Sequence, residues 1–540
     1  MHNCLAQTSP AADQPLHRAD AARCGPASRL AAAVGRWVVA AALILGAGCA
    51  SAPPGQDAVR TPTRADTVHD STPIGAQIAE LAAQHPGQSG FQLIRFGREA
   101  FTARIALADM AVRTLDVQYF LWDSDATGRR LADRLLRAAD RGVRVRVLVD
   151  DVNMKGRDVA LATLDAHPNV EIRLFNPFAS RSSHLLGFLT DFDRVNHRMH
   201  NKLMVMDNAV AIVGGRNMAD TYFEVDPTSN FRDLDVAAVG PIVRDLSGLF
   251  DRFWNGTWAV PIAALVDRPY TQDDLRALVA RMRQAIANDS YPHPLDQDAG
   301  AMRTNVLAIA RRAVWATSRV VFDDPASIQD ASLRVMNKLL VQRASLLQRE
   351  VYVEAAYFIP RDRGVALLAS LVQRGVKVRV LTNSLASNDV IAAFAGYAGR
   401  REAVLRAGVE LYELRPEPGP VRKRLLGTGG RSGLHTKAIV FDRKDVFIGS
   451  FNLDPRSSSI NTEAGLYIES PALAEQVIAH MNTGVDLDNC YRVHLDGDGR
   501  MHWTTEDDGV QVRLNTDPMS TWSQRMKARF IRLLPIESQL

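Results

Sequence analysis

The sequence repeats itself, and this repeat constrains the fold more than any other feature. Residues 114–121 match residues 350–359, and residues 141–149 match residues 374–382, in the same order. In the second pair, a Gly that ends a helix precedes alternating apolar residues, a pattern typical of helix, short turn and strand. Two matches in one order indicate a duplicated domain.

A third match is the most specific. The first copy reads His200-x-Lys202, four residues, Asp207, six residues, and then Gly214-Gly215-Arg216-Asn217. The second copy keeps this spacing with His435, Lys437, Asp442, Gly449, Ser450 and Asn452. Each histidine follows the glycine of the preceding match by almost the same interval, 58 positions in one copy and 60 in the other.

Strands that alternate with helices predict an α/β fold of parallel sheets covered by helices. Helices are expected at 128–140 and 363–373, before the strands of the second match. We expect the two domains at 92–265 and 306–500, joined by a helical, charged linker over 266–305. An amphipathic C-terminal tail is expected over 501–540.

The composition excludes several classes of protein. With 540 residues, 46% hydrophobic and 23% charged, the chain is typical of a globular protein of two or more domains. A net charge of +4 is too small for an obligate nucleic-acid binder. Cys490 is the only cysteine beyond residue 49, so neither an internal disulfide nor a cysteine-held zinc is expected. No cofactor, metal or obligate protein partner is predicted.

The N-terminus is predicted to be a leader rather than part of the fold. Residues 1–48 place an apolar run after a basic flank, and the run is shorter than the ~20 residues that span a bilayer. Small residues before Cys49 favour a bacterial envelope lipoprotein acylated there, although Leu45 lies one position further away than usual. An uncleaved anchor and an apolar run without function are the alternatives. Residues 49–90 are expected to form a flexible tether.

The repeated motif predicts a phosphate site. His200 and Lys202, at i and i+2 of a predicted hairpin strand, share one face, and Asn217 ends the next strand. The second copy offers the same three groups. Ammonium and carboxamide donors suit phosphate oxygens, so two of each can stabilise a phosphodiester transition state without a metal. Two imidazoles can then supply a nucleophile and a proton donor.

A carboxylate is expected to orient each imidazole. Counting back eight residues from Pro241 and Pro471, which end the following strands, gives Asp233 and Glu463. Asp235 is an alternative to Asp233.

The other polar residues of the motif region are expected to be structural. Asp207 and Asp442 are assigned to turns and to structural hydrogen bonds. The spacing excludes His197 as the catalytic histidine, and Tyr119 and Tyr357 are assigned to the core.

These residues resemble the phospholipase D superfamily, whose signature His-x-Lys-x4-Asp-x6-Gly-Gly/Ser-x-Asn is present twice. More narrowly, the chain is similar to bacterial cardiolipin synthases of the C type in residues 196–202, 214–217, 233–235, 449–457 and 533–537. The resemblance implies two α/β sandwiches with one active site at their interface. It also implies a metal-free, two-step reaction through a phosphohistidine.

The resemblance also implies roles for the motif residues. By position, His200 is the nucleophile and His435 the general acid, although the symmetry of the motif alone allows the reverse. Lys202, Lys437, Asn217 and Asn452 are expected to bind phosphate. Ser450 adds a hydroxyl contact that Gly215 cannot make.

The implied reaction transfers a phosphatidyl group to a glycerol hydroxyl of phosphatidylglycerol. The donor would be another phospholipid, with phosphatidylethanolamine as a candidate. A membrane surface is expected as a partner because of the leader, the apolar run 185–189, the basic residues 422–424 and a basic amphipathic C-terminus with Trp522 and Phe530. A buried loop and a helix docked on the protein are the structural alternatives. Hydrolysis of lipid or nucleic acid and a non-catalytic membrane scaffold are the competing functions.

Overall fold

The structure is a computed structural model that describes residues 54–55, 57–67, 69–293, 295, 298–417 and 430–540. The expected leader, Cys49 and the basic residues 422–424 lie outside the described residues. Within the described ranges, no helix combines the length and the apolar character needed to cross a bilayer.

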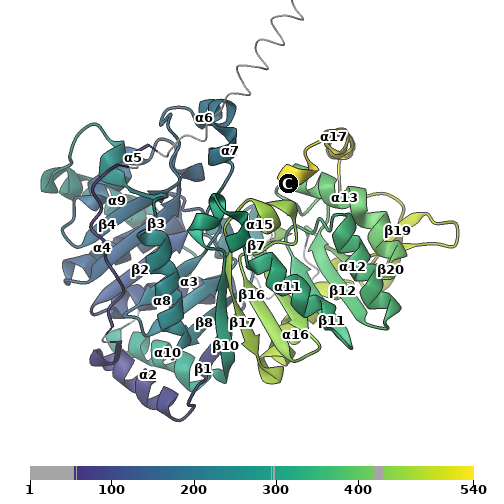
Figure 1. The fold of residues 1–540 in the computed structure, drawn as a ribbon, viewed down its shortest axis with the longest axis horizontal. Helices are drawn as coiled ribbons and strands as arrows, with labels where there is room; N and C mark the ends of the chain where they lie inside the picture. The colour runs from purple at the N-terminus through teal and green to yellow at the C-terminus, as the bar shows by residue number, and fades with distance from the viewer. Residues whose placement is uncertain (1–53, 56, 68, 294, 296–297, 418–429) are drawn as a thin grey trace, which may run out of the picture. The chain divides into compact units, whose positions relative to one another are not determined.

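In the described part of the chain, eighteen strands form one sheet (Figure 1). The two halves repeat the same strand order. The order is β8–β6–β5–β2–β3–β4 in the first half and β17–β16–β15–β11–β12–β13 in the second. Strand β9 lies beyond β4, and β18, β19 and β20 lie beyond β13.

The strands of the first half are β1 (Ser89–Ile94), β2 (Thr114–Tyr119), β3 (Arg144–Asp150), β4 (Val170–Phe175), β5 (Leu203–Met206), β6 (Val210–Gly214), β7 (Ser229–Arg232), β8 (Asp235–Val239) and β9 (Ala259–Pro261). Those of the second half are β10 (Val314–Phe322), β11 (Glu350–Ala355), β12 (Lys377–Asn383), β13 (Glu410–Leu414), β14 (Arg431–Leu434), β15 (Lys437–Phe441), β16 (Asp445–Gly449), β17 (Ala464–Glu469), β18 (Cys490–Leu495), β19 (Met501–Asp507) and β20 (Val510–Leu514).

Each half of the sheet is mixed, so the prediction of parallel sheets holds for only three strands of each half. Strands β2, β3 and β4 are parallel, whereas β5, β6 and β8 pair antiparallel. The reason lies in the hairpin turn: Asp207 and Asn208 both have φ of 51° within a three-residue connection, which is short enough to join only antiparallel strands. Asp442 and Arg443 repeat this turn with φ of 50° and 57°.

Among the described residues, two pairings between strands join the halves. Strand β1 pairs antiparallel with β10, from Ser89 opposite Ala316 to Phe91 opposite Val314. A separate short ladder pairs β7 with β14 in parallel, and its last pair is Arg232 opposite Leu434. The second pairing matters for function because β7 and β14 end one residue before Asp233 and His435.

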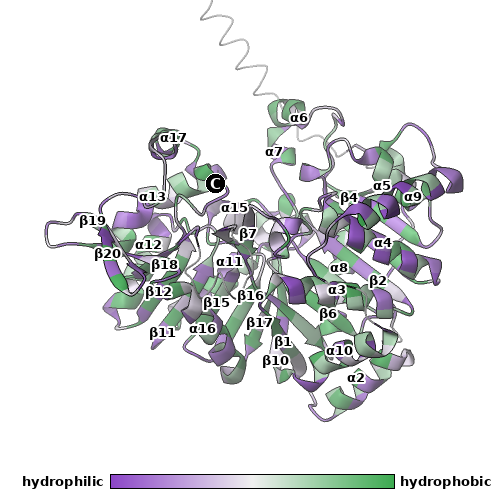
Figure 2. Ribbon diagram, turned by 180° about the vertical axis from the view of Figure 1, so that it is seen from behind, coloured by the Kyte–Doolittle hydropathy of each residue, from purple (hydrophilic) through white to green (hydrophobic). Residues whose placement is uncertain are grey.

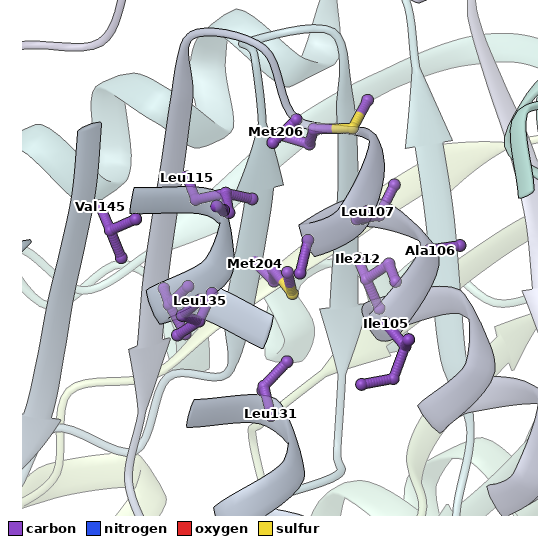
Figure 3. Close-up of a cluster of buried hydrophobic side chains, with 14 of the residues drawn as sticks. Ile105, Ala106, Leu107, Leu115, Leu131, Leu135, Val145, Met204, Met206 and Ile212 are labelled. Carbon is purple, nitrogen blue, oxygen red and sulfur yellow. The ribbon is translucent and has the colours of Figure 1, made fainter. Parts of the chain in front are cut away.

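Helices cover the sheet and bury its apolar faces. In Figure 3, side chains of α3 and α4 meet those of β2, β3, β5 and β6 in a core that includes Leu107, Leu131, Leu115 and Met204. A second core contains residues of both halves, with Phe250 of α8 and Val477 of α16 in one cluster. The helices of the first half and linker are α2 (Pro73–Ala83), α3 (Gly97–Met110), α4 (Ala126–Asp140), α5 (Asp158–Asp165), α6 (His184–Thr190), α7 (Phe192–Val195), α8 (Ile242–Trp254), α9 (Gln272–Asn288) and α10 (Ala299–Arg311). Those of the second half are α11 (Met336–Ser345), α12 (Asp362–Gln373), α13 (Ile391–Arg406), α15 (Pro455–Ser459), α16 (Pro471–Val485) and α17 (Trp522–Arg532).

The structure differs from the expected domain boundaries at both ends. The predicted flexible tether includes α2, whose Ile74 and Ile78 are buried in the first core, because Thr72 caps an amphipathic helix there. The predicted C-terminal tail begins with β19 and β20, which extend the second half of the sheet. The helical linker predicted over 266–305 holds α9 and the start of α10.

Candidate active site

The two motif histidines lie where the halves meet. Each precedes the hairpin strand on which the sequence placed it: β5 begins at Leu203 and β15 at Lys437. A parallel bridge joins Met199 to Thr462, the residues directly before His200 and Glu463. The β7–β14 ladder ends in the same way, directly before Asp233 and His435. Parallel pairing keeps both chains running in one direction, so the next residue of each chain lies opposite the other.

The halves therefore exchange their histidine partners. His200 Nδ1 lies 2.9 Å from Glu463 Oε2, and His435 Nδ1 lies 2.7 Å from Asp233 Oδ2. All four side chains are buried. An Nδ1–H that donates to a carboxylate leaves the Nε2 lone pair free for nucleophilic attack or for accepting a proton.

The structure separates Asp233 from its alternative, Asp235. The Asp235 carboxylate lies 2.9 Å from Arg104 and 3.3 Å from Arg216 in a buried ion-pair cluster. Its partners are structural, whereas Asp233 reaches the imidazole.

The two orienting carboxylates have different environments. Glu463 accepts hydrogen bonds from Ser450 and from Ser457 Oγ, the latter at 2.8 Å. Asp233 accepts one from the backbone N–H of Leu234 at 2.8 Å. A Cβ atom on Gly215 would lie 2.1 Å from Asp233 Oδ1, so this position has no room for the serine found at 450. The hydroxyl of Ser450, expected to bind substrate, is instead bonded to Glu463 and to the Ala464 N–H.

Burial shifts the pKa values of both histidines downward. Burial lowers the pKa of His200 to about 4, although Glu463 raises it in part. Burial and the ammonium groups of Lys437 and Lys202 lower the pKa of His435 well below its usual value. His200 also contributes to the shift of His435, so the two rings interact electrostatically. Both imidazoles are thus neutral near pH 7 in the free protein.

The carboxylate pKa values follow their environments. Burial raises the pKa of Asp233, and Lys437 offsets only part of this rise. Burial also acts upward on Glu463, but His200, Lys202 and the Ser450 hydroxyl together bring its pKa below the ordinary value.

Two lysines place positive charge beside the histidines. Each ammonium donates to the backbone oxygen of its own motif histidine, Lys202 to His200 and Lys437 to His435. Burial lowers the pKa of Lys437 to about 8, with Asp233 raising it in part, and burial lowers that of Lys202 well below its usual value. An anionic phosphodiester would stabilise the charged form of both.

The two motif asparagines are buried and differ in their contacts. Asn217 donates to the hydroxyl of Tyr222 at 2.9 Å, and its oxygen accepts from the backbone N–H of Leu121. The side-chain oxygen of Asn452 is buried and has no hydrogen-bond partner among the described residues.

Three aromatic residues that the sequence did not single out surround the histidines. Phe120 lies edge-on to His200, with ring centroids 5.0 Å apart, and also contacts Lys202. Tyr222 and Phe231 lie 5.0 and 5.3 Å from the ring of His435. Phe120 directly follows β2, and Phe231 lies two residues before Asp233. Their place beside motif residues is the only sequence signal that points to them.

The remaining motif residues lie away from the histidine pairs. Asp207 accepts from the backbone N–H of Arg113 and Thr114, and Asp442 from that of Arg349 and Glu350, so both hold the hairpin turn against the neighbouring strand.

The histidine and the two tyrosines that the sequence analysis placed outside the catalytic site each have a polar partner elsewhere. The ring nitrogen Nδ1 of His197 lies 2.7 Å from the Ile460 backbone oxygen. Tyr119 is buried and hydrogen bonded to Arg104. Tyr357, expected in the core, is half-buried and bonds to Asp389.

The comparisons with known proteins agree with this geometry. The model of the family described as "Cardiolipin synthase, PLD-like domain" matches residues 105–254 and 340–484, and the chain belongs to this phospholipase D-like family. The chain is 40% identical to cardiolipin synthase C of Escherichia coli K12 over 475 residues, which covers 86% of this chain and 99% of that one. It is 28% identical to cardiolipin synthase A of Pseudomonas entomophila, over 73% of this chain and 68% of that one.

A solved structure shows the same fold. The phosphatidylserine synthase of Haemophilus influenzae Rd KW20 superposes with a TM-score of 0.54 at 13% identity, over 86% of this chain and all of that one. The two matched regions of the family model correspond to the two halves of the sheet.

Proposed function

We propose that the chain is a phosphatidyltransferase that makes cardiolipin by transferring a phosphatidyl group to phosphatidylglycerol. The observation that carries this proposal is the pair of exchanged histidine–carboxylate contacts at the seam between the halves. The 40% identity to a cardiolipin synthase C over nearly its full length supports the substrate class. A phospholipase D-type hydrolase is the second candidate, because the same pairs can activate water.

In the first step, His200 Nε2 attacks the phosphorus of a donor phospholipid and His435 donates a proton to the leaving alcohol oxygen. Glu463 stabilises the positive charge that develops on His200 as the N–P bond forms. Both lysines and the amides of Asn217 and Asn452 bind the phosphoryl oxygens as charge develops on them.

Since both histidines are neutral in the free protein, His435 must gain a proton when substrate binds. The negative phosphodiester favours this by raising the pKa of the nearby imidazole. In the second step, His435 takes the proton of the acceptor hydroxyl, whose oxygen attacks phosphorus and releases His200.

The proposed substrates are phosphatidylglycerol as acceptor and phosphatidylglycerol or phosphatidylethanolamine as donor. A membrane surface is the proposed location, and acylation at Cys49 is the proposed anchor. Transfer needs a second lipid in place of water at the phosphohistidine, which is the one step that separates the two candidates.

Product analysis tests the proposal. Purified protein is incubated with phosphatidylglycerol, with and without phosphatidylethanolamine, and separately with plasmid DNA, and the products are identified by mass spectrometry. Cardiolipin and the free headgroup alcohol are expected in equal amounts. Phosphatidic acid as the main product would support the hydrolase. Nicked plasmid would indicate that the substrate is a nucleic acid rather than a lipid. Cells that lack other cardiolipin synthases should gain cardiolipin when they express this chain.

A further inference from the structure

The exposed apolar side chains of this molecule are concentrated in two short segments. Ten of the nineteen large exposed hydrophobic residues in the described chain lie within residues 185–192 and 519–534. The first group is Leu185, Leu186, Leu189 and Phe192; the second is Met519, Trp522, Met526, Phe530, Leu533 and Leu534. Apolar groups gathered in this way mark an interaction surface rather than ordinary scatter.

One side of each segment packs on the protein, and the other side is exposed. In α6, Gly187 is buried against Phe178, and Phe188 packs edge-on to the same ring, while Leu185 and Leu189 are 69% and 59% exposed. Figure 2 shows α6 as a hydrophobic helix at the periphery of the fold. The outward leucines therefore have no partner in the described part of the chain, although the helix itself is held in place.

Helix α17 likewise packs on the protein along one face and is exposed along the other. Its Ala528 is buried, and Ile531 packs against the core of the second half. Trp522, Phe530 and Leu533 are 70%, 63% and 80% exposed along the opposite face. A capping box formed by Thr521 and Gln524 begins the helix.

The two segments lie on the same side of the fold, on either side of α15 (Figure 1). Hydrogen bonds connect them there. Asn196, which follows α7, accepts a hydrogen bond from Arg456 of α15 and donates one to Gln539 near the C-terminus. The next residue of α15, Ser457, donates to Glu463, the partner of His200. The apolar segments thus flank the element that supports the active-site carboxylate.

We propose that α6–α7 and α17 form one surface that docks on an anionic lipid bilayer beside the active site. This inference rests on the proposed function, because a lipid substrate must leave a bilayer to reach the histidines. Charge selects a bilayer over an uncharged partner: Lys527, Arg529 and Arg532 are exposed among the apolar residues of α17. Asp193 is the exposed carboxylate on the α7 side, so the attraction to anionic headgroups comes from α17. Trp, Phe and Leu beside Lys and Arg on a surface helix are typical of an interfacial membrane helix.

The test uses the full chain and compares two forms of one substrate. Turnover is measured on a short-chain phosphatidylglycerol below its critical micelle concentration and on vesicles of phosphatidylglycerol and phosphatidylcholine. The docking variants are Leu185→Ser with Leu189→Ser, and Trp522→Ser with Phe530→Ser. The matched control is Val510→Ser with Leu346→Ser, since these residues are 64% and 60% exposed and lie outside both segments.

Each docking variant should lose at least about tenfold in turnover on vesicles, because apolar area withdrawn from the bilayer no longer contributes to binding. Turnover on monomeric lipid should stay unchanged, since none of these residues contacts the histidines. Lys527→Glu with Arg529→Glu should lower vesicle turnover and weaken its dependence on salt. The control should match the original chain on both substrates.

Amide hydrogen exchange gives a readout that does not depend on turnover or on the N-terminal leader. On anionic vesicles, residues 185–192 and 522–534 should exchange more slowly than without vesicles. Unchanged exchange in both segments, or equal vesicle turnover in docking and control variants, would overturn the inference. A third result would also overturn it: both segments are already protected without vesicles, the protein is a dimer, and the docking substitutions abolish both the protection and the dimer. The surface would then bind a second copy of the chain. If the original chain turns over neither form of lipid, the proposed function fails, and exchange still decides the docking surface.

Discussion

The two halves of the molecule share one scaffold and differ in how they hold the partner of the opposite histidine. The second half supplies Glu463 with Ser450 and Ser457 as donors, and the first half supplies Asp233 with a backbone N–H and a glycine at 215. The residue at the Gly/Ser position and the carboxylate therefore form one unit in each half. The strand order is the same in both halves, whereas these units differ.

This difference also shifts the pKa values of the two carboxylates in opposite directions. Three side chains donate to or interact with Glu463 strongly enough to bring its pKa below the ordinary value, whereas burial keeps that of Asp233 raised. A lower pKa marks a carboxylate that holds its negative charge and can stabilise a cationic imidazole. This favours His200, the partner of Glu463, as the residue that carries the covalent phosphoryl group.

Removal of either histidine should have the largest effect and tests that assignment. Both His200→Ala and His435→Ala should lose at least about 10⁴-fold in turnover, as loss of a nucleophile or acid–base group does in other covalent mechanisms. The variants should differ in what they accumulate. With a donor that needs little protonation of its leaving group, His435→Ala should trap a phosphatidyl adduct on the peptide that contains His200. Mass spectrometry of the digested protein detects it, and an adduct on His435 in the His200→Ala variant would reverse the roles.

Neutral analogues of the carboxylates should have the next largest effect. Asp233→Asn and Glu463→Gln should each lower turnover by about 10²–10⁴-fold, because an amide can hold the wrong imidazole tautomer. Glu463→Gln should slow formation of the phosphohistidine more than its breakdown if His200 is the nucleophile. Rapid-quench measurement of the two steps distinguishes them. Equal effects on both steps in both variants would remove the functional difference between the halves.

Substitutions at positions 215 and 450 should show that each residue is matched to the carboxylate beside it, Gly215 to Asp233 and Ser450 to Glu463. Gly215→Ser should lower turnover by about 10²-fold, because the added Cβ overlaps Asp233 and moves it away from His435. Ser450→Gly should cost less, about tenfold, because Glu463 keeps Ser457 and His200 as partners. Turnover, with thermal unfolding as the control for folding, measures both. A larger loss in Ser450→Gly would contradict the packing argument.

Much of this arrangement could be predicted from local sequence. The strands of the repeat, the hairpin turn at Asp207 and the carboxylate of Glu463 follow from spacing and alternation, whereas spacing left Asp235 as an alternative to Asp233. The exchange of partners could not be predicted, because the Met199–Thr462 bridge and the β7–β14 ladder join segments more than 190 residues apart. The role of Gly215 could not be predicted either, because Asp233 approaches it closely only in the folded chain. Helix α2 was missed because a Pro-rich, polar stretch precedes it and masks its short apolar face.

The smallest expected effect concerns the two lysines and appears in the pH dependence of kcat/KM, which reports the free protein. Burial lowers the pKa of Lys437 to about 8, so its ammonium is lost as the pH rises through that value. In the proposed mechanism the charged form binds phosphate, so its loss should lower kcat/KM by a further factor of about ten for each pH unit above it. In the proposed mechanism the neutral form of His200 is the nucleophile, and its pKa of about 4 places the acid limit there. Because His435 must gain a proton when substrate binds, kcat/KM should also decline as the pH rises above the pKa of this imidazole. Lys437→Arg keeps its charge at all these pH values and should remove the additional fall above about pH 8 while lowering the overall rate, because a planar guanidinium does not reproduce the position of an ammonium. An alkaline midpoint near pH 8 that persists in Lys437→Arg would assign the limit to another group, and a midpoint that moves only in Lys202→Arg would transfer it to the first half.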